Sequence, residues 1–143
     1  MPGETEVKDS GAVRAPHFEL GARGEALAIE HLERVGYRIV AANFSLPIGR
    51  NTRDAIVNAE IDLVAYDGAT LCFVEVKTRE SHEFGEAAEA VTPLKQRTMV
   101  QLAIDYMARH RLTSEPCRFD VVSIHLEAGR PVVELFQNAF NIA

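Results

Sequence analysis

Four charged residues near the middle of the chain have types and spacing that could hold a divalent metal ion and act on a water molecule: Glu60, Asp62, Glu75 and Lys77. Glu60 and Asp62 are two residues apart, as are Glu75 and Lys77, and residues two apart on an extended strand point to the same side of a sheet. Carboxylates gathered in one patch repel one another, which raises their pKa values or requires a counter-ion. Because Mg²⁺ binds oxygen ligands, Asp62 and Glu75 suit it, and Lys77 could orient or activate a water molecule. The alternative is an exposed sheet surface whose acids pair in solution with Lys77 and arginines.

Two β-rich segments, residues 59–66 and 71–78, carry these four residues. Between them lies Asp67-Gly68, a dipeptide that favours tight hairpin turns because glycine tolerates positive φ. A two-residue turn there pairs Tyr66 with Ala69 and predicts a hairpin with Glu60 opposite Glu75.

Side-chain alternation sorts this predicted hairpin into two faces. One face is apolar and is expected to point toward the core: it comprises Ala59, Ile61, Leu63, Ala65, Cys72, Val74 and Val76. The other face carries all four charged residues at the end that lies away from the turn. The alternation therefore predicts that the charged patch and the core occupy opposite sides of the sheet.

A further carboxylate, Glu25, lies on the inward stripe of the helix predicted at residues 18–35. It precedes Ile29 by four residues and Leu32 by seven, which places all three on one helical face. One interpretation brings Glu25 toward the charged patch. The other keeps it solvated near the helix start, where a carboxylate complements the helix dipole.

The remaining pattern predicts an α/β fold in which helices flank a central mixed β-sheet in the order αβββαββ. The expected elements are a helix at 18–35 ended by Gly36, a strand at 37–44, a loop or ragged hairpin at 45–58, the hairpin described above, a helix from Thr92-Pro93 to about Arg111, and strands at 117–126 and 131–136. Because a helix connects them, the strands at 71–78 and 117–126 are expected to be parallel.

Asp62, followed on the next strand by Glu75-Val76-Lys77, resembles the PD-(D/E)XK nuclease signature. More closely, residues 18–140 resemble the YraN family of small bacterial proteins. The blocks that carry this resemblance are GEA at 24–26, EIDL at 60–63, FVEVKTR at 73–79, AVTP at 90–93, KQ at 95–96 and CRFDVV at 117–122. The chain departs from the family in having Ala59 where glycine is usual, and a longer connection at 46–58. The resemblance implies a restriction-endonuclease-like fold similar to that of archaeal Holliday junction resolvases.

The same resemblance implies a role for each matching residue. Asp62, Glu75 and the Val76 carbonyl would bind Mg²⁺ or Mn²⁺, Lys77 would be the catalytic lysine, Glu25 the acid of the first helix, and Gln96 the glutamine of the second helix. The implied activity is metal-dependent hydrolysis of phosphodiester bonds in DNA, including branched or otherwise structured DNA. The alternative is a non-catalytic module on the same fold that binds nucleic acid or another protein.

Composition limits the remaining possibilities. A chain of 143 residues, 47% hydrophobic and 25% charged, predicts one domain at residues 17–143 after a flexible N-terminal tail at 1–16. The net charge of −6 excludes a generally basic coat, so DNA would have to contact local basic segments at 34–53 and 95–111. Without a signal-like or membrane-spanning run, we expect a cytoplasmic protein with no membrane partner, and the sequence leaves oligomerisation open.

Overall fold

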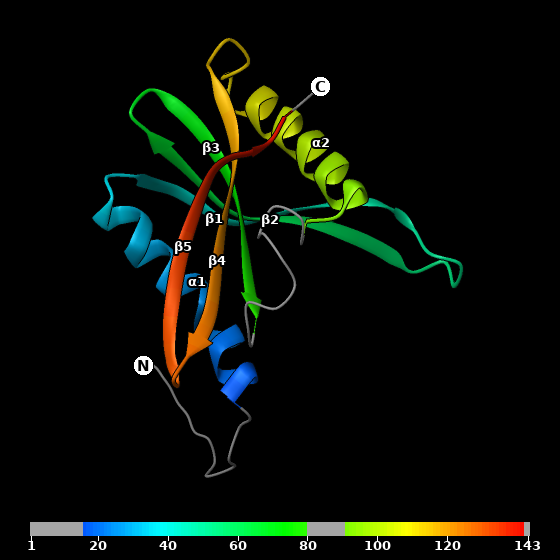
Figure 1. Cartoon of the computed structure of the whole chain (residues 1–143). Helices are drawn as coiled ribbons and strands as arrows, with labels where there is room; N and C mark the ends of the chain where they lie inside the picture. The colour runs from blue at the N-terminus through cyan, green and yellow to red at the C-terminus, as the bar shows by residue number, and fades with distance from the viewer. Residues whose placement is uncertain (1–15, 80–90, 142–143) are drawn as a thin grey trace, which may run out of the picture.

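The computed structural model describes residues 16–79 and 91–141, which form an α/β fold with a five-stranded mixed sheet and two helices (Figure 1). Along the chain the elements are α1 (Pro16–Arg34), β1 (Arg38–Arg50), β2 (Ile56–Asp67), β3 (Thr70–Arg79), α2 (Pro93–Arg109), β4 (Cys117–Glu127) and β5 (Arg130–Phe140). The strands lie in the sheet in their chain order. The expected mixed sheet with two helices is confirmed.

Three of the four strand pairs are antiparallel, and β3 with β4 is parallel, as the intervening helix predicted. The predicted flexible tail lies outside the described residues up to residue 15, and α1 already begins at Pro16. Within the described ranges, no helix combines the length and apolar character that crossing a membrane requires.

Each face of the sheet carries its own apolar core, covered by one helix. On the α1 face, Ala28 and Leu32 are fully buried in a cluster with residues from β2, β3 and β4. On the α2 face, Tyr106 contacts Phe44 and Phe73 edge to face, at ring-centroid distances of 5.1 and 5.8 Å. The two helices therefore pack on opposite faces of the sheet (Figure 1).

The second helix begins where its capping residues predict. The Thr92 side chain accepts a hydrogen bond from the Lys95 N–H at 3.1 Å, and Pro93 occupies the first turn, where its missing N–H costs nothing. At the end of α1, Gly36 adopts a φ of 103°, which glycine tolerates and a residue with a side chain resists.

The predicted register of the β2–β3 hairpin is wrong by two residues. Asp67 pairs with Thr70, so the turn consists of Gly68 and Ala69. Gly68, with a φ of 60°, takes the first turn position, where a type II′ hairpin turn favours glycine. Asp67 stays in the strand, where its carboxylate accepts from Arg118 at 2.8 Å. A shift of two preserves which face each side chain occupies, because strand alternation has a period of two.

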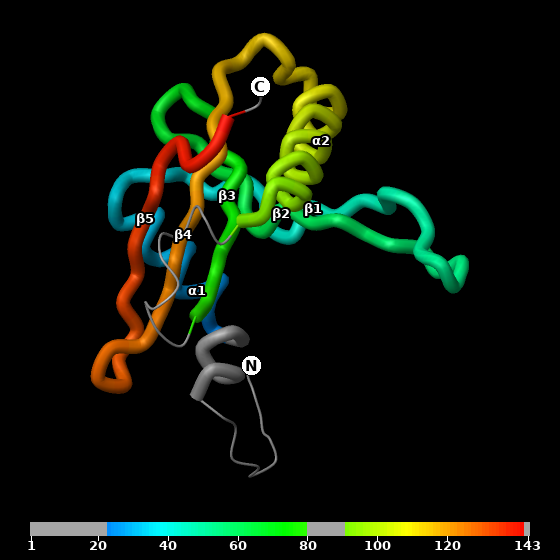
Figure 2. The backbone as a smooth tube through the Cα atoms, turned by 45° about the vertical axis from the view of Figure 1, so that its right-hand side comes forward, coloured from blue at the N-terminus to red at the C-terminus, as the bar shows by residue number. Residues whose placement is uncertain are grey.

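Residues 45–58 form a projecting hairpin, so of the two alternatives the loop is wrong and the hairpin is confirmed. Pairing between β1 and β2 continues to Arg50 and Ile56. At the tip, the Asn51 side chain accepts hydrogen bonds from the N–H groups of Arg53 and Ala55. We call residues 46–57 the arm, and Figures 1 and 2 show it extending away from the rest of the sheet.

The predicted alternation of β2 breaks near Asp62. Ile61 packs in the α2-side core and Leu63 in the α1-side core, although residues two apart normally share a face. On the neighbouring strand Asn43 adopts a φ of 56°, so both strands are irregular at this level. The prediction that Ala59 and Ile61 share a face with Leu63 is therefore wrong, because the side chains of β2 change face between Ile61 and Leu63.

Candidate functional site

The predicted acidic residues meet in a notch where β2 and β3 separate. Pairing between these strands ends at Leu63 and Val74; beyond that point β2 continues along β1, and β3 along β4. Asp62 is the next residue of β2, and its Oδ2 accepts a hydrogen bond from the Val76 N–H at 2.8 Å. The N–H and C=O of one strand residue point to the same neighbour, so the Val76 carbonyl also faces the notch.

Glu75 is the most strongly perturbed carboxyl group in the notch. The residue is 6% exposed, and its Oε1 is buried with no hydrogen-bond donor among the described residues. Burial and the nearby Asp62 carboxylate together raise the pKa of Glu75 to about 7, against the opposing effect of Lys95 and Lys77. The Lys95 Nζ lies 3.7 Å from Oε1. Such a group favours the arrival of a positive charge.

A cleft of about 220 Å³ opens from the notch toward α1. It is lined by Gly24, Glu25, Asn43, Glu60, Asp62, Val76 and Thr78. Glu25 accepts hydrogen bonds from the Asn43 Nδ2 at 3.0 and 3.3 Å. Burial raises the pKa of Glu60, with Asp62 and Glu25 adding to the increase. The structure therefore brings Glu25 into the same cleft as two of the predicted acids.

The four charged residues do not form one flat patch. Glu60 and Asp62 line the cleft on the α1 side, whereas Glu75 forms an ion pair with Lys95 of α2. Lys77 follows Glu75 by two residues on β3 and is half-buried. The expectation that all four residues share one face of the sheet is therefore wrong. Because β2 changes face at Asp62, the acids of β2 lie on the α1 side and Glu75 of β3 lies on the α2 side.

Gln96 takes a different place. Its side-chain Nε2 donates to the Val91 carbonyl at 2.9 Å, which ties the first turn of α2 to the residue before the helix cap. Gln96 is not among the residues that line the cleft. Lys95, its neighbour, does reach the site, since its Nζ also donates to the Glu60 carbonyl at 3.3 Å.

Comparison with known proteins identifies the family of this chain. The family described as "Uncharacterised protein family UPF0102" matches residues 24–124. The chain belongs to this family. A UPF0102 protein of Geobacter metallireducens is 42% identical over 124 residues, which cover 87% of this chain and 93% of that protein. UPF0102 protein STH1475 of Symbiobacterium thermophilum is 45% identical over 123 residues, 85% of this chain and 96% of its own length.

The matched region of UPF0102 contains every residue proposed for the site, from Glu25 to Gln96. Membership confirms the YraN-like resemblance of the sequence blocks. Among solved structures, one titled "Crystal structure of SSO0001" has a TM-score of 0.41 at 12% identity, covering 90% of this chain and 55% of that one.

The oxygen donors at the notch of this UPF0102 protein could hold a small divalent cation that takes few of its ligands from the protein. Among the described residues, no group of three or more His, Cys, Asp or Glu side chains is arranged around a common metal position. Mg²⁺ commonly takes one or two carboxylates and completes its shell with water and substrate phosphates. Asp62, the Glu75 Oε1, which accepts no hydrogen bond within the described part of the chain, and the Val76 carbonyl could supply such ligands.

A side chain at Gly24 should damage this cleft. A Cβ there would lie 2.6 Å from the Thr78 Cγ2, closer than atoms pack, so either the Thr78 side chain must change rotamer or α1 must move away from β3. We expect Gly24→Val to lower the free energy of unfolding by roughly 1–3 kcal/mol. Urea denaturation measures this, with Ala26→Val at an exposed position of the same helix as the matched control. Equal losses in both variants would show that the close approach at Gly24 is unimportant.

Glu75→Gln should change how the stability of the metal-free protein depends on pH. The folded protein holds a proton on Glu75 that the unfolded chain releases between pH 4.5 and about 7. The free energy of unfolding of the wild type should therefore decrease as the pH rises through that interval, by roughly 3 kcal/mol from this group. The neutral glutamine should remove that decrease.

Urea unfolding on both sides of the interval, with a chelator present, tests this expectation. Glu30→Gln is the matched control, because the Glu30 side chain is 67% exposed and its ion pair in the described part of the chain is with Arg34 of the same helix. If Glu75→Gln retains the wild-type pH dependence, Glu75 carries its charge in the folded protein without cost.

Proposed function

We propose that this protein is a metal-dependent nuclease with a restriction-endonuclease-like fold that hydrolyses phosphodiester bonds in DNA. The single observation that carries the proposal is the buried Oε1 of Glu75, which has no hydrogen-bond donor among the described residues and lies beside Asp62 and the Val76 carbonyl. Burying a carboxylate oxygen without a donor is costly, and a cation is the partner that removes the cost. An arrangement that raises the pKa of a carboxyl group to about 7 is typical of functional sites.

In this proposal Asp62, Glu75 and the Val76 carbonyl hold Mg²⁺ or Mn²⁺. A divalent cation held there would polarise the scissile phosphate and lower the pKa of an attacking water. Lys77 extends from the same strand face as Glu75 and would orient that water or stabilise negative charge on the phosphate. Glu25, fixed by Asn43, would hold water molecules at the α1 side of the cleft.

Gln96 has a supporting role in the proposal. Its bond to the Val91 carbonyl keeps the first turn of α2 in place, and that turn carries Lys95 to the acids. Basic residues near the cleft would contact the DNA backbone, because phosphate contacts supply most sequence-independent affinity. Lys95 of α2, whose Nζ reaches the Glu60 carbonyl, is the candidate closest to the acids, while the acids remain near the cation.

The test is a cleavage assay with single-stranded, duplex, flap and four-way DNA over a titration of Mg²⁺ and Mn²⁺. We expect metal-dependent cleavage of at least one substrate, with branched DNA preferred, and no cleavage by Asp62→Asn prepared in parallel. Equal cleavage by wild type and variant would indicate a contaminating nuclease. DNA binding without cleavage at any metal concentration would instead favour the non-catalytic module and contradict the proposal.

A further inference from the structure

The outward face of α2 carries an apolar stripe in addition to the face that packs on the sheet. The inward residues are buried, whereas Leu94 is 66% and Ile104 is 56% exposed. The outward stripe comprises Leu94, Arg97, Gln101, Ile104 and Ala108, all exposed. Its spacings of three and four residues are those of a helix that packs along another helix.

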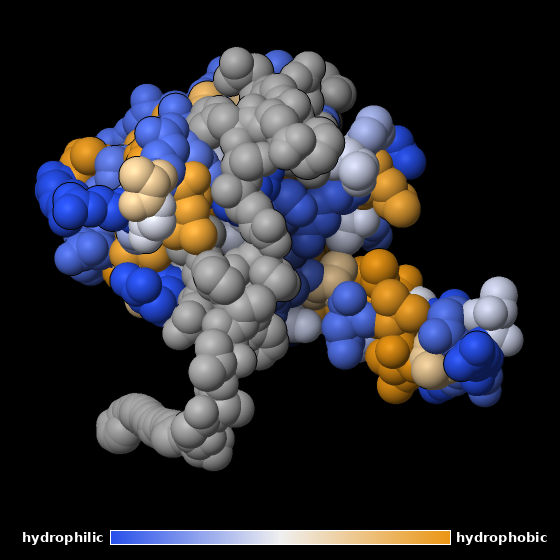
Figure 3. All heavy atoms as spheres, turned by 60° about the horizontal axis from the view of Figure 1, so that its bottom comes forward, coloured by the Kyte–Doolittle hydropathy of each residue, from blue (hydrophilic) through white to orange (hydrophobic). Residues whose placement is uncertain are grey.

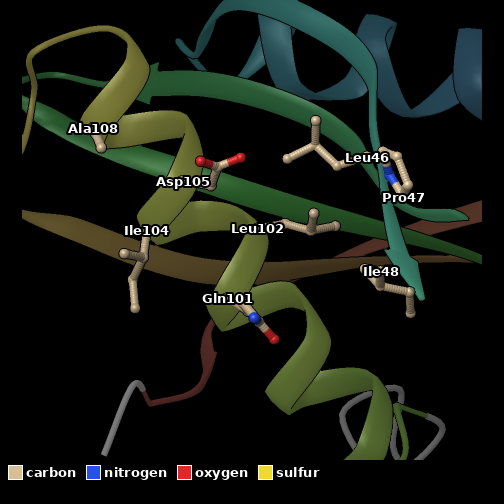
Figure 4. Close-up of a pocket in the computed structure, with 8 residues that line it drawn as sticks. All are labelled: Leu46, Pro47, Ile48, Gln101, Leu102, Ile104, Asp105 and Ala108. Carbon is tan, nitrogen blue, oxygen red and sulfur yellow. The ribbon is translucent and has the colours of Figure 1, made fainter.

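The stripe borders a groove of about 430 Å³ between α2 and the arm (Figure 4). Its arm side is formed by Leu46, Pro47 and Ile48, and Ile48 is 50% exposed. On the opposite strand of the arm, Ile56 is 58% exposed, and apolar atoms gather along the projecting hairpin in Figure 3. A two-stranded ribbon is marginally stable by itself in water, so the arm gains from a covering partner.

We propose that a second copy of this chain covers this surface, with the two α2 helices packed antiparallel about a two-fold axis at Gln101. The charges on and beside the stripe support this arrangement, and they include Asp105, which borders the stripe and pairs with Arg109 of its own helix at 3.0 Å. Arg97 precedes Gln101 by four residues and Asp105 follows it by four, so each Arg97 faces the partner's Asp105. The apolar ends match as well, because Leu94 and Ala108 each lie seven residues from the axis.

Two-fold symmetry makes the same surface serve both copies, which is how most homodimers form. A parallel arrangement of the helices would instead bring Arg97 against Arg97 and Asp105 against Asp105, and like charges in contact oppose association. In the antiparallel arrangement the groove beside each α2 receives apolar side chains from the partner's helix, and the arm closes over them. This dimer does not depend on the nuclease proposal.

Disulfide trapping tests the axis directly. Gln101→Cys, in a Cys117→Ser background that removes the partly exposed native thiol, should form an intermolecular disulfide under mild oxidation, because only the residue on the axis meets its own copy. Arg34→Cys, on the exposed end of α1, is the control for random collision and should remain monomeric on non-reducing gels. Equal cross-linking of the two variants would overturn the proposal.

A charge exchange tests the facing pairs. We expect Arg97→Glu and Asp105→Lys each to raise the dimer dissociation constant by about tenfold or more, and the double variant to restore it. Light scattering over a concentration series measures this, and circular dichroism checks that each variant is folded. The proposal is refuted if the wild type stays monomeric at every concentration, or if neither single substitution changes the dissociation constant of the dimer. Either result would assign the stripe to a different partner.

Discussion

Lys77→Met should lower the rate of metal-dependent DNA cleavage by about 100- to 1000-fold, the loss typical of removing a group that acts on the reacting atoms. Lys77 lies two residues beyond Glu75 on β3, so its ammonium shares the strand face of the proposed ligand. Methionine keeps most of the side-chain length and removes the charge. The rate should fall at saturating Mg²⁺ with little change in the DNA dissociation constant.

The chain supplies a matched control in Lys95, the other lysine that lowers the pKa of Glu75. Lys95→Met should cost less than about tenfold at high pH, because Lys95 comes from α2 and acts on Glu75 and the DNA backbone rather than on the reacting atoms. Without Lys95, Glu75 should keep its proton to higher pH, so the pH at which metal activates cleavage should rise. If the two variants lose activity equally at every pH, Lys77 has no distinct catalytic role.

Local sequence signals were sufficient to predict the elements that carry the site. Thr92-Pro93 starts α2 through a side-chain cap, and Asp67-Gly68 marks the β2–β3 turn to within one residue. Both signals act within a few residues of chain, where the conformational preferences of the residues themselves decide the outcome. The parallel pairing of β3 with β4 follows from the crossover helix between them.

The features that the sequence did not reveal depend on contacts between distant segments. Arg118 on β4 binds Asp67 at the end of β2, which is 51 residues earlier in the chain. The change of face at Asp62 lies beside Asn43, which has a positive φ on the neighbouring strand β1. The pattern of apolar residues in β2 does not indicate this change. The sequence marks Lys95 as a candidate site residue, because it lies in the first turn of α2 within the KQ block. Only the fold shows that its ammonium group lies close to Glu75.

Asp120→Ala should be the most destabilising of the substitutions considered, with a loss on the order of 3–5 kcal/mol in the free energy of unfolding. The Asp120 side chain is fully buried and accepts hydrogen bonds from the Tyr37 hydroxyl at 2.7 Å, the Arg118 Nε at 3.0 Å and the Asn138 N–H at 2.8 Å. Burial and the bond to Asp120 raise the pKa of Tyr37, which keeps the phenol neutral as a donor. Removing the carboxylate leaves the Arg118 guanidinium, only 20% exposed, without its main partner.

Urea unfolding measures this loss, with Glu30→Ala as the control for an exposed ion pair, where less than about 1 kcal/mol is expected. Asp120→Asn should lose less than Asp120→Ala, because its amide oxygen can still accept one of these bonds. The network joins the segment after α1, the β2–β3 turn, β4 and β5, so its loss should loosen the hairpin whose open end holds Asp62 and Glu75. A small effect of Asp120→Ala would mean that apolar packing alone maintains the register, and the cleft should then keep its metal response in that variant.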